Sequence, residues 1–186
     1  DEVVAALAAT FDGVDVVVNA AGRSDAGSSD LPGMLAANAL LAGVAARAAH
    51  SAGVPRLLHI SSGAVQGDVP SLDSSPQVRP FSPYSYSKAV GERLALEHHP
   101  AAVVYRPAGV QGAERAVSRK LVAVARSPLA LVAGRGQGNS PQALIANVAD
   151  AAAFLALTDH TPPTIVHHPS EGLGVGELLH LLGGRR

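Results

Sequence analysis

Residues 80–100 read PFSPYSYSKAVGERLALEHHP, and the rest of the chain is organised around this stretch. Ser82 is a good helix N-cap, and Pro83 stands at the first helical position, where proline is tolerated. A run of helix-forming residues follows, and Pro100 ends it. The stretch therefore predicts a helix over residues 82–99.

Tyr84 and Lys88 stand four positions apart in this helix, so they share one face. An ammonium group beside a phenol favours the phenolate, and such a pair can exchange protons with a ligand. Tyr86 stands only two positions from Lys88 and points elsewhere. Because an isolated pair of this kind is more often an exposed tyrosine packed on a lysine stem, the interpretation depends on the rest of the chain.

Strand-like and helical runs alternate along the sequence. The apolar, β-branched runs are 14–18, 56–60, 102–105, 129–132, 143–146 and 164–167, and the helical runs are 2–10, 35–52, 82–99, 113–126, 147–157 and 175–182. Most connections are long enough for parallel pairing, so the pattern predicts a doubly wound α/β sheet.

Small or polar residues follow three of the predicted strands. They are Ala20-Ala21-Gly22, Ser61-Ser62 and Arg106-Pro107. In a parallel sheet the ligand crevice lies outside the carboxyl ends of the strands, so these residues are expected at one edge, near the start of the 82–99 helix. A simple tight turn is an equal alternative for residues 20–22.

The composition excludes several classes of protein. The 186 residues are 47% hydrophobic and 16% charged, which is typical of a globular domain. A net charge of −1 without a basic run argues against a nucleic-acid partner. The longest apolar run, 36–49, is interrupted by Asn38 and Arg47, so no membrane span is expected. The absence of cysteine is compatible with the cytoplasm, which is the expected location.

Other kinds of site have weaker support. The pairs His98-His99 and His167-His168 lack a carboxylate at ligand spacing, so no metal site is expected. Ser61 and Ser62 lack the Gly-x-Ser-x-Gly elbow of serine hydrolases. The glycines of residues 134–138 have the wrong spacing for a dinucleotide-binding turn.

Several segments together resemble the extended short-chain dehydrogenase/reductases, in particular the NAD-dependent epimerase/dehydratase group that acts on nucleotide sugars. The matching segments are DVVVNAA (15–21), NALLAGVAARAA (38–49), GVPRLLHISSGAVQG (53–67), PYSYSK (83–88), RPAGVQG (106–112) and LIANVADAA (144–152). The resemblance implies a Rossmann-like fold and an enzyme that removes a hydride from a sugar carbon while a tyrosine takes the hydroxyl proton.

The resemblance also assigns roles to residues. Tyr84 would be the general acid/base, Lys88 would favour its phenolate and bind the nicotinamide ribose, and Ser62 would hold the substrate oxygen. The catalytic residues are thus Ser62, Tyr84 and Lys88. The cofactor-binding residues are Ala20, Ala21, Gly22, Asn38, Ser61, Tyr84, Lys88 and Pro107, and the substrate-binding residues are Ser62, Gly63, Tyr84 and Gly109. NAD is the expected cofactor, with NADP left open.

The sequence departs from the family pattern in two ways. The glycine-rich phosphate-binding turn is not found, so about 60 residues are expected to be missing before Asp1. Gly109, Gln66 and Gln111 replace residues frequent in relatives, which puts the substrate in doubt. Residues 1–108 are interpreted as the later part of the dinucleotide-binding domain, and residues 109–186 as a mixed, irregular region that binds substrate.

Three functions remain open on the sequence. The leading one is an epimerase, dehydratase or reductase acting on a nucleotide sugar. A truncated, non-catalytic binding protein and a reductase of a non-sugar carbonyl compound are the alternatives. A homodimer through the helices 35–52 and 82–99 is a further expectation.

Overall fold

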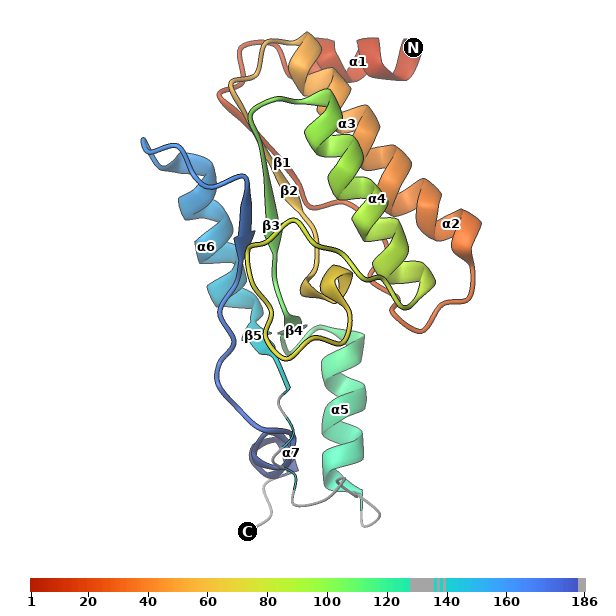
Figure 1. Cartoon of the computed structure of the whole chain (residues 1–186), viewed down its shortest axis with the longest axis vertical. Coiled ribbons are helices and arrows are strands. Elements are labelled where there is room, and N and C mark those ends of the chain that lie inside the picture. The colour runs from red at the N-terminus through yellow and green to blue at the C-terminus, as the bar shows by residue number, and fades with distance from the viewer. Residues whose placement is uncertain (128–135, 137, 139, 184–186) are drawn as a thin grey trace. The chain divides into compact units, whose positions relative to one another are not determined.

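The computed structural model describes residues 1–127, 136, 138 and 140–183 (Figure 1). The predicted strand 129–132 and most of the glycine-rich segment 134–138 lie outside the described residues. The chain divides into two compact units, which are described separately below. The first comprises Asp1–Pro107 and Ala151–His168, and the second comprises Ala108–Asp150 and the residues from Pro169 onward. The division at 108/109 proposed from the sequence stays a prediction.

A four-stranded parallel sheet forms the centre of the first unit. Its strands are β1 (Val16–Asn19), β2 (Arg56–Ile60), β3 (Ala102–Arg106) and β6 (Ile165–His167), in the order β1-β2-β3-β6. All three pairings are parallel, with Val17 beside Leu57 and Leu58 beside Val103. Every residue of β3 is buried, as the continuous apolar run in the sequence indicates. The predicted parallel α/β sheet is confirmed.

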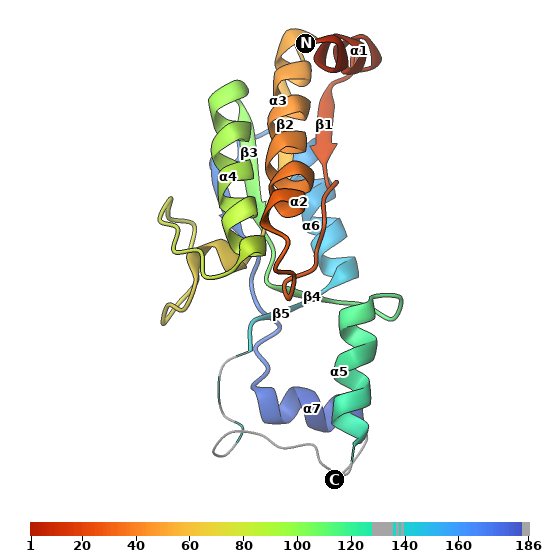
Figure 2. The same ribbon diagram turned by 90° about the vertical axis from the view of Figure 1, so that its right-hand side faces the viewer.

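Helices lie on both sides of this sheet. The side-by-side pair α3 (Leu41–Ser51) and α4 (Pro83–His98) covers one side, and the Ala151–Leu157 part of α6 (Ile145–Leu157) lies on the other (Figures 1 and 2). Arg56 fastens the end of α6 to β2, because its Nη1 donates to the carbonyl oxygens of Ala156 at 2.9 Å and Thr158 at 2.7 Å. Helix α1 (Glu2–Thr10) packs against α3.

Helix α4 begins as the sequence predicts. Ser82 Oγ accepts a hydrogen bond from the backbone amide of Ser85, and Ser85 Oγ accepts from the backbone amide of Ser82. This reciprocal capping box fixes the first turn, which contains Tyr84. The helix ends at His98, before Pro100.

A π-helical turn interrupts the predicted helix 35–52. The structure has α2 (Leu31–Leu35), a π-helical turn η1 (Ala36–Leu40) and α3 as one continuous run. By length and composition Leu31–Ser51 is long and apolar enough to span a membrane, which the sequence analysis did not expect. Alanines on one side of α3, such as Ala46 and Ala49, are fully buried, which is the pattern of a core helix in a folded domain.

Small side chains form much of the core. One cluster of buried residues contains Val17, Ala46, Ala49, Val54, Leu57, Ala95 and Ala102. The alanines allow the helices α3 and α4 to approach the strands closely, so the positions of side chains on α4 are fixed relative to the strand ends.

The second unit is smaller. It contains the parallel pair β4 (Gly109–Gln111) and β5 (Gln142–Leu144), with α5 (Ala116–Arg126) packed against α7 (Val175–Gly183). Strand β4 was not expected from the sequence, because three residues after a proline carry no periodic signal.

Candidate active site

The carboxyl ends of three neighbouring strands meet at one edge of the sheet. β1 leads into Ala20, Ala21 and Gly22, β2 leads into Ser61, Ser62 and Gly63, and β3 leads into Pro107. Lys88 of α4 reaches the same edge, where its Nζ donates to the carbonyl oxygen of Ile60 at 3.0 Å. The structure thus brings the site residues predicted in the first unit to one place.

The turn after β1 is exposed, and hydrogen bonds from the Asn38 side chain fix its backbone. Ala20, Ala21 and Gly22 are all exposed, and Gly22 has a φ of 147°, which L side chains rarely adopt. Asn38 Oδ1 accepts from the Arg23 amide at 2.9 Å, and its Nδ2 donates to the Arg23 carbonyl at 3.1 Å. A Cβ added at Gly22 would collide with Asn38 Oδ1, so the glycine is required for this approach.

The ends of β2 and β3 are tied together. The Gly63 amide donates to the Pro107 carbonyl oxygen at 2.8 Å. Ser62 is half-buried and caps a 3₁₀ turn, η2 (Gly63–Gln66), by accepting from the Ala64 amide at 3.2 Å. Since its oxygen accepts this bond, the hydroxyl proton of Ser62 remains available to an oxygen of a ligand.

Tyr84 and Lys88 differ in their surroundings. Tyr84 is half-buried, and within the described residues its hydroxyl makes no hydrogen bond, so it can bond to a ligand. Lys88 is only 7% exposed. Burial lowers the pKa of Lys88 to about 8, while the negative charge of Glu92 acts in the opposite direction.

Ser61 was assigned to the cofactor, but its hydroxyl is used inside the protein. It is buried, and its Oγ donates to Glu92 Oε1 at 2.5 Å. The hydroxyl proton of Ser61 is therefore not available to a cofactor, and the assignment stays a prediction. Sequence analysis missed Glu92, although its position four residues after Lys88 places it on the same helical face.

A second buried pair supports the turn after β1. Asn19 Nδ2 donates to His59 Nδ1 at 3.2 Å, and Asn19 Oδ1 accepts from the Ala21 amide at 3.3 Å. Since an amide NH₂ can only donate, the ring proton of His59 resides on Nε2. Burial, with a smaller effect of the Lys88 charge, lowers the pKa of His59 to about 3, so this ring is neutral at physiological pH.

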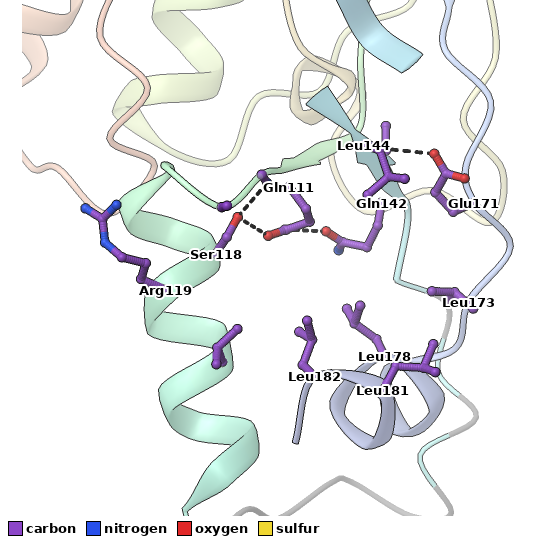
Figure 3. Close-up of a pocket in the computed structure, with 14 residues that line it drawn as sticks. Gln111, Ser118, Arg119, Gln142, Leu144, Glu171, Leu173, Leu178, Leu181 and Leu182 are labelled. Carbon is purple, nitrogen blue, oxygen red and sulfur yellow. Dashed lines mark hydrogen bonds between the residues drawn. The ribbon is translucent and has the colours of Figure 1, made fainter. Parts of the chain in front are cut away.

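The second unit contains Gly109 and a cavity of about 470 Å³ (Figure 3). Leucines of α7 line one side of the cavity, and the chain Ser118–Gln111–Gln142 lines the other. These polar groups bond to one another: Ser118 Oγ donates to Gln111 Oε1 at 2.7 Å, and Gln111 Nε2 donates to Gln142 Oε1 at 2.6 Å. The lining therefore suits an apolar group better than a charged one. The substrate contact predicted for Gly109 stays a prediction.

The arrangement in the first unit suits proton transfer. A phenol that has no partner among the described residues stands one helical turn from a buried ammonium group, and a serine hydroxyl stands at the adjoining strand end. Among the described residues, no three His, Cys, Asp or Glu side chains are placed to hold a metal ion. The groups present can donate to, or accept from, a hydroxyl or carbonyl oxygen.

Several solved structures are similar to this one. They include a double mutant of the dTDP-glucose 4,6-dehydratase DesIV from Streptomyces venezuelae with NAD and DAU bound (TM-score 0.78, 22% identity). They also include TunA, an NAD-dependent NDP-hexosamine 5,6-dehydratase of tunicamycin biosynthesis (0.80, 23%), and the UDP-glucuronic acid 4-epimerase of Bacillus cereus (0.79, 19%). At these identities the likeness establishes the fold.

The compared regions differ in extent. The alignments cover 96%, 98% and 97% of this chain, but only 59%, 64% and 63% of the three relatives. No curated protein matches the sequence. Residues 2–167 match the model of the NAD dependent epimerase/dehydratase family. Since that match includes most of the 186 residues, the chain belongs to the NAD dependent epimerase/dehydratase family.

Proposed function

We propose that this protein modifies a nucleotide sugar by NAD-dependent hydride transfer, with Tyr84 as the general acid/base. The observation behind the proposal is the Tyr84 hydroxyl, which makes no hydrogen bond to the part of the chain that the structure describes and lies one turn from the buried Lys88, at the edge where three strands end. Family membership supports the cofactor, and the similar structures include enzymes named for dTDP-glucose and UDP-glucuronic acid.

The turn after β1 fits the nicotinamide half of the cofactor. Ala20, Ala21 and Gly22 are exposed and present no side chain larger than a methyl group, so a ligand can approach the backbone. Asn38 fixes the adjoining backbone at Arg23. NAD, when bound, supplies the hydride acceptor.

Each catalytic residue has a distinct task. Tyr84 acts as a phenolate: it takes the proton of the sugar hydroxyl as the hydride leaves the same carbon, and it becomes a phenol in that step. The positive charge of Lys88 favours the phenolate that the step requires at its start. Ser62 donates its hydroxyl proton to the substrate oxygen and so orients it. The fate of the resulting ketone decides between an epimerase, a dehydratase and a reductase.

The chain offers a matched pair of variants for testing this role. Tyr84→Phe removes the hydroxyl at the proposed site. Tyr86→Phe removes an exposed hydroxyl that lies two residues further along the same helix and faces another direction. We expect Tyr84→Phe to lower turnover of a nucleoside diphosphate sugar at least about 100-fold and to spare NAD binding, because a positioned acid/base contributes about 10²–10⁴. Tyr86→Phe should retain wild-type turnover. Undiminished turnover in Tyr84→Phe would exclude the proposed role.

Binding and product analysis complete the test. Calorimetric titration with NAD⁺ and NADP⁺ measures the affinity of the chain for each cofactor, and ¹H NMR of the sugar product identifies the reaction. Saturable NAD⁺ binding without turnover of any sugar would favour a non-catalytic binding protein. Turnover of a simple ketone, but not of a nucleotide sugar, would favour a carbonyl reductase.

A further inference from the structure

Glu92 lies at the centre of a buried network that joins α4 to the ends of β2 and β3. Its Oε1 accepts from Ser61 Oγ at 2.5 Å and from Arg106 Nε at 2.9 Å, and its Oε2 accepts from Arg106 Nη2 at 2.7 Å. Arg106 is fully buried and Glu92 is 4% exposed. The guanidinium fork matches the carboxylate, so Glu92 is held as a carboxylate in one orientation.

Lys88 and Glu92 hold consecutive residues of the same strand end. Lys88 donates to the carbonyl oxygen of Ile60, and Glu92 accepts from the hydroxyl of Ser61, so two positions on one face of α4 fix the backbone that leads to Ser62. Arg106 extends the network to the loop before α4, because its Nη1 donates to the Ser75 carbonyl at 2.7 Å.

We propose that Glu92 is a positioning residue for Lys88: its buried carboxylate, one turn further along the same face of α4, is the counter-charge of the Lys88 ammonium, and its bond to Ser61 aligns the Ser62 turn with the Tyr84–Lys88 face. The consequence for catalysis rests on the proposed function. The effect on the charge of Lys88 does not, because it depends only on the folded chain.

The other groups around Lys88 do not replace this carboxylate. From β2, His59 is neutral, since burial keeps its pKa near 3. From β3, Arg106 is positive and already paired with Glu92. On α4 itself, Tyr84 offers a hydroxyl and not a carboxylate. Glu92 is the charged group that raises the pKa of Lys88 against the effect of burial.

The sequence makes the charge of Lys88 directly measurable. Lys88 and Lys120 are the only lysines in the chain, and Lys120 is exposed on α5. Protein labelled with ¹³C-lysine therefore gives two side-chain Cε signals, which Lys120→Arg assigns. Each signal is followed between pH 6 and 12 in the unmodified chain and in the variants. The expected midpoint for Lys88 in the unmodified chain is near pH 8.

Loss of the carboxylate should lower this midpoint. In Glu92→Gln we expect a decrease of about one pH unit, which is a tenfold decrease in the ratio of charged to neutral Lys88 at a given pH, because a nearby opposite charge shifts a pKa by about that much or more. Ser61→Ala removes the hydrogen bond but keeps the carboxylate, so its Lys88 midpoint should equal that of the unmodified chain. Lys120 should not change in any variant.

A second variant guards against misfolding. Glu92→Gln leaves Arg106 buried without a counter-charge, whereas Glu92→Gln/Arg106→Met also removes the guanidinium. Only Lys88, whose charge the titration measures, then stays buried without this partner, and the double variant is expected to fold. A Lys88 midpoint in either folded variant equal to that of the unmodified chain would overturn the proposal. Because these titrations need no substrate, their failure is distinct from failure of the Tyr84 assay.

Discussion

Asn38 Nδ2 donates to Ser87 Oγ at 3.0 Å and thereby joins the π-helical turn η1 to the helix that contains Tyr84. The connection continues, because Ser87 Oγ donates to the backbone carbonyl of Tyr84 at 2.8 Å. The same amide holds both backbone groups of Arg23. One buried side chain therefore links the turn after β1 to the first turn of α4.

Removing this amide should loosen the turn after β1. We expect Asn38→Ala to lower the free energy of unfolding by about 2–3 kcal/mol, because buried polar groups lose their partners. Ser87→Ala removes only the link to α4 and should cost about 1 kcal/mol. Urea unfolding measures both. Hydrogen exchange at the Arg23 amide should accelerate in Asn38→Ala alone; unchanged protection there would show that Asn38 does not hold this turn.

The crossing of α4 over η1 depends on Gly91. A Cβ at Gly91 would collide with the backbone carbonyl oxygen of Asn38, and neither backbone can move without disturbing the core. At Gly43 of α3 an added Cβ would instead meet Leu94 Cβ at 3.3 Å, so Leu94 would have to move by only a few tenths of an ångström. We expect Gly91→Ala to destabilise the protein by about 1–3 kcal/mol. Gly43→Ala should be near neutral, because alanine favours the helix by about 1 kcal/mol and offsets the crowding.

Equal unfolding midpoints for the two alanine variants would contradict this interpretation of the crossing. Far-ultraviolet circular dichroism under urea titration is sufficient for the comparison. Hydrogen exchange at the amides of η1 near Asn38 should also change in Gly91→Ala, because the Asn38 backbone has to move. It should not change in Gly43→Ala.

The sequence was informative where local chemistry determines the structure. Ser82 and Pro83 fix the start of α4 because the cap and the proline act within one turn. The apolar run R-L-L-H-I becomes β2 with the same bounds, 56–60, since a buried parallel strand needs only local β propensity and burial on both faces. The strand ends then follow from the parallel topology.

Long-range pairing was not visible in the sequence. The ion pair of Glu92 with Arg106 joins residues on different elements, and nothing local to either residue signals it. The π-helical turn likewise depends on how Asn38 meets Arg23 and Ser87. The direction of the Ser61 hydroxyl is also set by Glu92, a residue 31 positions away, so nothing local to Ser61 shows that this hydroxyl is used inside the protein.

Lys88 should reduce the stability of the protein at neutral pH. Its folded pKa is lowered from 10.5 to about 8 by burial, so the folded state holds a charged, desolvated amine below pH 8. Lys88→Met removes this cost and loses one hydrogen bond, so we expect a net stabilisation of about 1–2 kcal/mol at pH 7.

The difference between the two proteins should decrease as the pH rises. Between about pH 8 and 10.5 the unfolded state binds more protons than the folded state at Lys88, so the stability of the unmodified chain increases with pH relative to that of Lys88→Met. Urea unfolding at pH 7 and pH 10 measures the effect. A gap that is constant over this range would show that burial does not perturb Lys88.

His59 should make the protein sensitive to acid. Burial and the Lys88 charge lower its folded pKa from 6.5 to about 3, so on acidification the unfolded state takes up a proton that the folded state does not. The contribution of His59 to stability is therefore complete above pH 6.5 and is lost progressively toward pH 3, by an amount on the order of 3–5 kcal/mol.

His59→Gln cannot titrate and still offers Asn19 an acceptor. Asp73 also has a lowered pKa, from its bonds to Ser75 and Gln66, and it acts equally in both proteins. We therefore expect the unmodified chain to lose more stability than His59→Gln between pH 7 and pH 4.5 in urea unfolding, whereas parallel losses would mean that His59 is protonated in the folded state.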